Sequence, residues 1–221
     1  MKLYRFRYSP YARKIQMLLD LLEHRYDVVE VPYADRTELA TLTKGYIYVP
    51  VLVDDDGTVV VESRDIAERL LSRPGGEALV PRGLEGPVWA YADFADGPLE
   101  DVMFRIGSPA VRDAWPTAGE RALYVLVKER KFGAGCVDAW LRDRDTLLDR
   151  ARKLLAPTER TLSEKPFLFG EEPTLADAAL YGNLVMLEEA DRTLLPKLSP
   201  SLVDFARRLE SRASRGRARP R

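Results

Sequence analysis

Cysteine and histidine are almost absent from this chain. Its 221 residues include one cysteine, Cys136, and one histidine, His24. A single cysteine excludes an internal disulfide and favours a reducing compartment. Structural zinc sites use four cysteine or histidine ligands, so we expect no metal of that type. His24 ends a helical pattern, where a structural role is expected, and Cys136 is either a buried small apolar residue or, less commonly, a reactive thiol.

Long apolar runs and an excess of one charge are also missing. No apolar run approaches the ~20 residues of a membrane-spanning helix, and the opening MKLYRFR lacks the apolar stretch of a signal peptide. Lys plus Arg number 34 and Asp plus Glu 35, so no net charge favours nucleic acid or a membrane surface as a partner. Together these absences predict a globular cytoplasmic protein.

Strand and helix patterns alternate in the first third of the chain. Residues 2–6 alternate polar with apolar side chains, as in a strand. Ser9-Pro10 then opens a helical pattern, because serine caps helices and proline is tolerated at the first helical position. Later patterns predict further strands and a second helix, at 26–31, 49–53, 58–61 and 63–71, with Asp56-Gly57 as a hairpin signal. The order predicts an α/β domain over residues 1–72 with a mixed four-stranded sheet.

The composition changes after residue 72. Residues 73–85 are rich in proline and glycine and predict a linker. Strand patterns then disappear, and the rest of the chain predicts an all-α domain over 86–211, with helices at about 86–105, 118–131, 137–164, 174–190 and 200–211. We expect Pro157 to kink or break the third of these. Residues 212–221 hold five arginines and predict a flexible tail.

Ser9 is the first candidate for chemistry. It lies where a strand pattern ends and a helix begins, beside unpaired N–H groups that carry partial positive charge. A thiolate at this position would be stabilised. Arg13 and Lys14 follow, although the start of a helix usually disfavours cations, and this indicates an anion nearby. The alternative interpretation is that Ser9-Pro10 is only a helix cap.

Two further segments are candidates for a binding site. Val49-Pro50 follows an irregular loop and heads a strand, a position that favours a cis proline, with an ordinary trans proline at a strand edge as the alternative. With a cis bond, the backbone of Val49 is free to pair with an extended ligand. Glu62-Ser63 opens a helix, where it either caps the helix or holds a ligand carboxylate and an ammonium group.

These residues lie in segments that resemble the cytosolic glutathione S-transferase family. The resemblance is carried by SPYARKIQMLL, VPVLVDDDGTVVVESRDIAERLL and PTLADAALYG. It implies a thioredoxin-like fold for residues 1–72 and an all-helical second domain with an electrophile pocket. It also implies glutathione as co-substrate, a small hydrophobic electrophile as second substrate, and a homodimer. In the third segment Thr174 and Asp177 match a buried capping box.

The resemblance assigns roles to individual residues. Ser9 matches the serine that donates a hydrogen bond to the sulfur of glutathione. Val49 and Pro50 match the residue that pairs with the cysteinyl backbone and the cis proline after it. Glu62 and Ser63 match the pair that holds the γ-glutamyl end. Ser9 and Ala12 stand where glutaredoxin-like relatives have redox cysteines, which argues against thiol–disulfide exchange there.

Departures from the family pattern leave alternatives open. The approach to Val49 is unusual, with Lys44 as a candidate contact for the glycyl carboxylate. Tyr8 is the second candidate for thiol activation, whereas Tyr4 shares a strand face with Phe6 and is expected to pack in the core. Alternative functions are a glutathione-transferase-like scaffold without turnover, or a glutathione-dependent isomerase or dehalogenase on the same site. Phe94, Phe104 and Trp115 are candidates to line the electrophile pocket.

Overall fold

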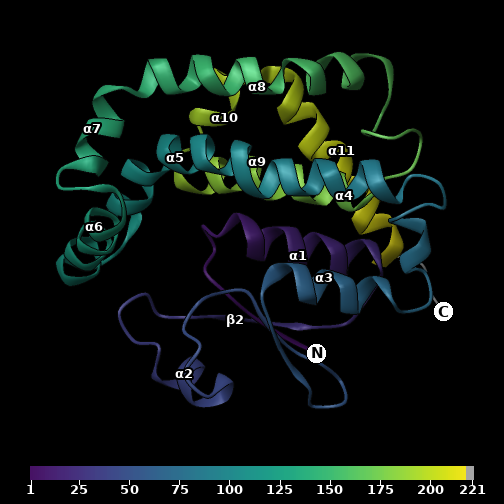
Figure 1. Cartoon of the computed structure of the whole chain (residues 1–221), viewed down its shortest axis with the longest axis horizontal. Coiled ribbons are helices and arrows are strands. Elements are labelled where there is room, and N and C mark those ends of the chain that lie inside the picture. Colours follow the sequence, from purple (N-terminus) through teal and green to yellow (C-terminus); the bar gives the residue numbers. More distant parts are fainter. Residues whose placement is uncertain (218–221) are drawn as a thin grey trace.

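A mixed four-stranded sheet forms the base of the molecule (Figure 1). The computed structural model describes residues 1–217, with side chains through residue 214. The sheet order is β2-β1-β3-β4; β1 pairs parallel with β2 and antiparallel with β3, and β4 is antiparallel to β3. The strands are β1 Lys2–Arg5, β2 Asp27–Glu30, β3 Val51–Val53 and β4 Val59–Val61. The predicted mixed sheet and the predicted hairpin are confirmed.

Two helices cover one face of this sheet. Helix α1, Pro10–Leu21, and helix α3, Ser63–Leu71, lie side by side between the sheet and the second domain (Figure 1). Helix α2, Thr37–Thr43, lies on the loop that leads from β2 to β3. α1 buries residues toward both neighbours, including Ile15, Leu18 and Leu19 at 0% exposure, because the second domain packs on its other side.

The remainder of the described chain is helical, as predicted. A short 3-10 helix, Gly76–Ala78, lies in the connection. The second domain then consists of α4 Glu85–Phe94, a π turn η2 Ala95–Leu99, α5 Glu100–Ala114, α6 Ala118–Phe132, α7 Cys136–Arg142, α8 Arg144–Glu164, α9 Leu175–Ala190, α10 Leu194–Leu198 and α11 Pro200–Arg217. Among the described residues, none of these helices has the length and apolar character needed to cross a membrane.

Three predictions about these helices were wrong. The helix expected over 86–105 continues to Ala114, with a π turn at Pro98 and with Pro109 inside α5. The helix expected over 137–164 is divided at Asp143, while Pro157 lies inside α8 without breaking it. Pro157 is exposed, so the carbonyl group that loses its N–H partner faces water. The buried neighbours Leu155 and Thr158 hold this turn against the core.

The predicted flexible tail is partly helical. Helix α11 runs six residues beyond the expected end at 211 and ends at Arg217. Ala213 is buried at 5% exposure and Arg212 forms an ion pair with Glu172 at 2.8 Å, so packing extends the helix. Residues 218–221 of the predicted tail lie outside the described residues.

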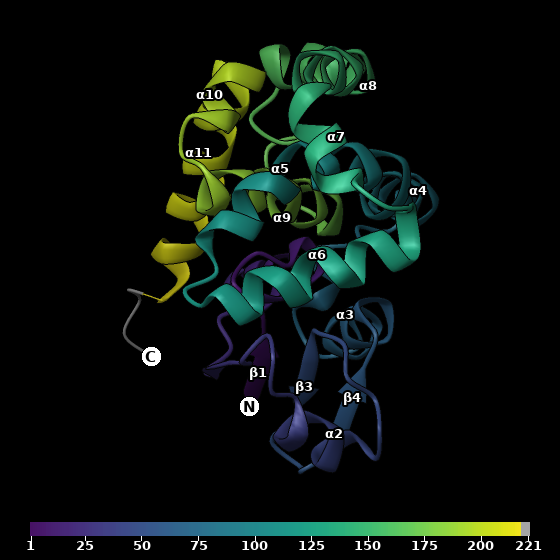
Figure 2. The same ribbon diagram turned by 90° about the vertical axis from the view of Figure 1, so that its left-hand side faces the viewer.

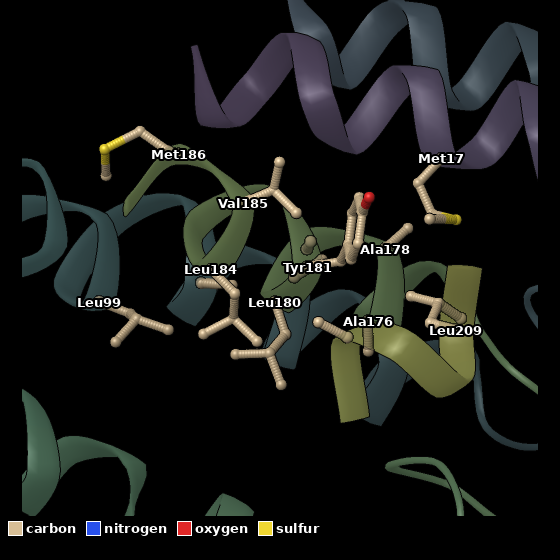
Figure 3. Close-up of a cluster of buried hydrophobic side chains, with 14 of the residues drawn as sticks. Met17, Leu99, Ala176, Ala178, Leu180, Tyr181, Leu184, Val185, Met186 and Leu209 are labelled. Carbon is tan, nitrogen blue, oxygen red and sulfur yellow. The ribbon is translucent and has the colours of Figure 1, made fainter. Parts of the chain in front are cut away.

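Helix α9 is the buried centre of the molecule. Every residue from Leu175 to Leu187 is buried, and Figure 3 shows its side chains directed both toward α1, near Met17, and away from it. A helix that is buried around its whole circumference has neighbours on every side. Its start is fixed by the predicted capping box, in which Asp177 accepts hydrogen bonds from the N–H and hydroxyl groups of Thr174, both at 2.8 Å.

Candidate functional site

The strand register places three predicted segments at one end of the sheet. Tyr4, near the end of β1, pairs with Val51 at the start of β3, and Val51 pairs with Val61 at the end of β4. The residues that follow β1, precede β3 and follow β4 therefore lie at the same end of the sheet. Ser9, Val49-Pro50 and Glu62-Ser63 belong to these three connections. The structure thus brings the principal candidate residues to one region.

Ser9 is the N-cap of α1. Its side-chain oxygen accepts a hydrogen bond from the N–H of Ala12 at 3.3 Å, and its backbone is extended, with φ −86° and ψ 114°. Since this hydroxyl acts as an acceptor within the helix cap, its proton is available for donation to a group beyond the helix start. Pro10 follows at the first helical position, where it lacks an N–H group, and the side chain of Ser9 is only partly buried.

The Val49–Pro50 peptide bond is cis, as predicted. Neither backbone polar group of Val49 takes part in a hydrogen bond with any described residue of the chain. Val49 precedes β3 and is only partly buried. An extended ligand therefore meets an unpaired donor and an unpaired acceptor at this position.

The start of α3 presents further unpaired donors. The first N–H groups of a helix have no intrahelical partner, and no side chain caps those of α3. The helix dipole adds partial positive charge there. Glu62, the N-cap, has φ 65° and ψ 127°, a conformation uncommon for a residue other than glycine and one that often marks a functional site. Its carboxylate accepts a hydrogen bond from the Tyr46 hydroxyl at 3.0 Å. Burial and this carboxylate raise the pKa of Tyr46.

Lys14 connects the start of α3 to the second domain. Its side chain is 3% exposed, and its ammonium group donates to the hydroxyl oxygen of Ser63 at 3.1 Å and to the carboxylate of Asp96 in the π turn. Burial raises the pKa of Asp96, and the Lys14 ammonium opposes that rise. Because Ser63 accepts from Lys14, its hydroxyl proton is free to point toward a ligand. The sequence indicated an anion near Lys14, but it did not indicate the roles of Asp96 and Tyr46.

Arg13 is directed away from the start of α3. Its guanidinium contacts Gln16 at 3.2 Å and Glu189 on α9 at 3.5 Å, and its side chain is 13% exposed. The Arg13 Nε atom is buried without a hydrogen-bond partner among the described residues. Arg13 therefore lies near Ser9 along α1, while its guanidinium group is paired with Glu189 of α9.

Tyr8 and Tyr4 occupy different environments. Tyr8 is half-buried beside the ring of Trp115, with centroids 5.6 Å apart, and burial raises the pKa of its hydroxyl. Tyr4 is buried in the sheet core at 8% exposure, as predicted, and its hydroxyl donates to Glu38 at 3.3 Å. Lys44 ends α2 with φ 59° and is exposed; within the described part of the chain its side chain makes no hydrogen bond or ion pair with the other candidate residues.

Aromatic residues gather around Tyr8. This aromatic cluster consists of Phe6, Tyr8, Tyr33, Trp115 and Tyr124. Ring centroids are 4.6 Å apart between Tyr33 and Trp115 and 5.5 Å between Tyr33 and Tyr124. An adjoining cavity of about 390 Å³ shares Phe6 and Trp115 with the cluster and is otherwise lined by Arg5, Arg7, Glu30, Val31 and Glu189. An apolar surface and an ion-paired one therefore meet at this cavity.

The other aromatic candidates lie outside this aromatic cluster. Phe104 packs with Phe132 and Trp140, while Phe94 packs with Tyr91 in the main core. Cys136 is buried beside Trp140, and burial raises the pKa of its thiol, which fits its interpretation as a small apolar residue. Burial and the Arg73 guanidinium lower the pKa of His24, which lies next to the sheet rather than at the candidate site.

Comparisons with known proteins agree with this geometry. Residues 3–78 match the profile of the glutathione S-transferase N-terminal domain, and residues 108–213 match that of the glutathione S-transferase C-terminal domain. The chain belongs to the glutathione S-transferase family. The curated prostaglandin E synthase 2 of Mus musculus is 24% identical, and the aligned region spans 84% of this transferase-family chain but only 63% of the mouse protein.

Several solved structures share the fold of this chain. The glutathione S-transferase CsGST83044 of Ceriporiopsis subvermispora, in complex with glutathione, is 20% identical with a TM-score of 0.76, covering 97% of this chain and 98% of the other. Glutaredoxin 2 of Salmonella typhimurium, also in complex with glutathione, is 18% identical with a TM-score of 0.74, covering 96% and 94%. A glutathione S-transferase of Pseudomonas fluorescens is 26% identical with a TM-score of 0.66, covering 95% and 94%.

Proposed function

We propose that the protein is a glutathione transferase that activates the thiol of bound glutathione for attack on a small hydrophobic electrophile. One observation carries the proposal: the capping hydroxyl of Ser9, the unpaired backbone of Val49 and the uncapped start of α3 meet at one end of the sheet. Each supplies a group that one part of the tripeptide requires. The glutathione complexes of the two structural relatives support this use of the fold.

The tripeptide is oriented by its polar ends. Its γ-glutamyl carboxylate accepts hydrogen bonds from the Ser63 hydroxyl and the first N–H groups of α3, and its ammonium group faces Glu62. The cysteinyl backbone pairs with Val49 as a neighbouring strand would, next to Pro50. Lys44 is proposed to contact the glycyl carboxylate. This binding mode brings the cysteinyl side chain toward the start of α1.

Thiol activation follows from the position of Ser9. A free cysteine thiol has a pKa of about 8.5 and is mostly protonated at neutral pH. A hydrogen bond from Ser9 and the partial positive charge at the start of α1 favour the thiolate, and Arg13 adds to the local positive potential without contact. The thiol proton passes to water, the sulfur bonds to the electrophilic carbon, and the leaving group departs with its electron pair.

Ser9→Ala tests the activating group. We expect this substitution to raise the pKa of the bound thiol by about 1–2 units, since one hydrogen bond to a charged sulfur is lost. The conjugation rate at neutral pH falls by ~10–100-fold as the thiolate fraction falls. Ultraviolet absorbance of the bound thiolate against pH gives the pKa, and a generic aryl halide gives the rate.

Two matched variants complete the test. Ser9→Thr retains the hydroxyl group and is expected to retain most activity, while Tyr8→Phe removes the second candidate hydroxyl. Equal thiol pKa values in Ser9→Ala and the unaltered protein, with a raised value in Tyr8→Phe, would transfer the role to Tyr8. Glutathione binding without turnover of any electrophile would favour the scaffold alternative. Turnover restricted to isomerisation or dehalogenation would favour a glutathione-dependent isomerase or dehalogenase.

Ser63→Ala tests the proposed binding of the γ-glutamyl end. Loss of a hydrogen bond to a carboxylate is expected to weaken glutathione binding by ~10-fold, while the pKa of the bound thiol stays within about 0.3 units because Ser63 lies at the other helix start. Calorimetric titration with glutathione measures the first quantity. The exposed Ser72→Ala, at the far end of α3, is the control, and an equal affinity in both variants would contradict the assignment.

Further proposals accompany this function. The cytoplasm is the expected compartment because the proposed co-substrate is a reduced thiol. We also propose a homodimer, which light scattering would test. The predicted domains over 1–72 and 86–211 remain the proposed units of glutathione and electrophile binding, respectively.

A further inference from the structure

Lys128 is a partly buried cation that pairs with no carboxylate among residues 1–214. Its ammonium group lies 4.7 Å from the centroid of the Phe104 ring and 4.8 Å from that of the Tyr124 ring. Such contacts attract a cation to ring faces, but they do not neutralise its charge. Among the described side chains, Lys128 forms no ion pair. The charge of Lys128 is therefore not neutralised by an ion pair within this part of the chain.

Glu100 is the acidic residue whose charge acts on Lys128. Burial lowers the pKa of Lys128 to about 8, and the charge of Glu100 acts in the opposite direction. Burial also raises the pKa of Glu100 itself to about 7, and this carboxyl group lies against the hydroxyl of Tyr11. Glu100 is thus only partly ionised at neutral pH and does not form an ion pair with Lys128 in the described structure.

Contacts connect these groups to the residues on either side of Ser9. Tyr11, two residues after Ser9, donates to the carbonyl of Asp96 at 2.9 Å and contacts Glu100 at the start of α5. On the other side, Tyr8 contacts Trp115, from which ring contacts continue through Tyr33 to Tyr124 and Lys128.

Helix α6 carries the last two of these residues across the N-terminal end of α1. The two ribbon views agree on this position, with α6 lying off the start of α1 in Figure 1 and passing in front of it in Figure 2. The Tyr124 hydroxyl is held to Ser108 of α5 at 2.7 Å, which fixes α6 against α5. Lys128 is therefore held on a helix that is fixed against α5 and lies off the start of α1, and the ring faces beside it suit an aromatic group.

From this geometry we infer that the second substrate is an aromatic electrophile that carries a carboxylate or similar anionic group, and that Lys128 binds this group. The inference rests on the proposed function, because it concerns the electrophile end of the same site. It changes the expectation of a wholly hydrophobic second substrate: the ring contacts the aromatic cluster, and the anion completes the environment of Lys128.

Two ligands that differ only in the anion test the inference without requiring turnover. S-benzylglutathione and its para-carboxybenzyl analogue are titrated calorimetrically into the full-length protein. We expect the carboxylated ligand to bind ~10-fold more tightly, as one charge-assisted hydrogen bond allows. Lys128→Met is expected to abolish this preference while changing the affinity for S-benzylglutathione by less than ~2-fold. Lys128→Arg retains a cation and is expected to retain the preference.

Lys131→Met provides the matched control. Lys131 lies on the same helix, but it is exposed and its ammonium group lies 5.0 Å from the Phe132 ring. The preference should survive this substitution. Equal preference in the unaltered protein and Lys128→Met overturns the inference alone, whereas failure of glutathione and both conjugates to bind overturns the proposed function with it.

The pH dependence provides a second readout. The groups that face Lys128 are Glu100 from α5, Arg36 from the loop before α2, Lys131 from α6 and Cys136 from α7. Raising the pH through about 8 neutralises Lys128 and completes the ionisation of Glu100, so both changes weaken anion binding. The preference for the carboxylated ligand should therefore fall between pH 7 and about 9. Lys128→Arg stays charged over this pH range, so its preference for the carboxylated ligand should fall less. The same pH profile in Lys128→Arg and in the unaltered protein would contradict the role of Lys128.

Discussion

Asp177→Ala is expected to lower the free energy of unfolding by about 3–5 kcal/mol, the largest loss for any single substitution considered for this protein. The residue is 0% exposed, and its carboxylate accepts hydrogen bonds from both polar groups of Thr174 and from the N–H of Leu168 at 2.9 Å. Alanine leaves three buried donors without a partner. The melting temperature should fall by about 6–20 °C for a chain of this size.

A second capping box in the same chain separates burial from the motif itself. Thr117 and Glu120 form the same reciprocal hydrogen bonds at the start of α6, where they face solvent. Glu120→Ala should therefore cost only about 1 kcal/mol, since water replaces the lost acceptor. Similar losses for Glu120→Ala and Asp177→Ala in thermal or denaturant unfolding would show that burial of the box contributes nothing.

Gly182→Ala is expected to cost about 3 kcal/mol and to weaken glutathione binding at the same time. A Cβ atom at this position would overlap the carbonyl oxygen of Pro10 and lie 3.1 Å from the backbone nitrogen of Lys14. Both atoms belong to the backbone of α1, so no side-chain rotation relieves the overlap, and α1 must move away from α9. The helix start that carries Ser9 moves with it.

Two other helical glycines provide a graded control. At Gly107 the nearest atom to a new Cβ is the sulfur of Met186, at 2.8 Å, and a flexible methionine can adjust, so a cost of about 1 kcal/mol is expected. At Gly119 the nearest atom lies at 4.0 Å, and alanine should stabilise α6 by about 0.5 kcal/mol. A melting temperature for Gly182→Ala equal to that of Gly119→Ala would contradict a close approach of α1 and α9.

The fold could be predicted from the sequence where the backbone conformation of a segment depends mainly on its own residues. The capping serine at Ser9, the proline at the head of β3 and the Asp-Gly turn each reflect the backbone conformation that they adopt. The effect of prolines on helix length was less predictable. Pro109 lies inside α5 and Pro157 inside α8, because packing of the flanking apolar residues outweighs one missing hydrogen bond.

The candidate site was predictable for its backbone elements but not for its charges. Arg13 is near Ser9 in the sequence, yet helical phase directs its guanidinium to Glu189 on α9. Lys14, one residue later, instead reaches Ser63 and Asp96. Lys128 and Glu100 lie more than ninety residues from Ser9 in the chain, and only the packing of α5 and α6 brings them near. Sequence spacing contains no information about such long-range neighbours.

The π turn η2 determines which charges of one continuous helical segment face which neighbour. A π turn holds about one residue more than an α turn, which rotates all later side chains by ~100° around the helix axis. Asp96 within the turn faces Lys14, whereas Glu100 just after it faces Tyr11 and the side of Lys128. Removal of a single residue between Gly97 and Leu99 would restore uniform α-helical winding and rotate Glu100, Phe104 and Ser108 together. Such a deletion would therefore alter the side of the site proposed for the second substrate, while Asp96 keeps its place opposite Lys14.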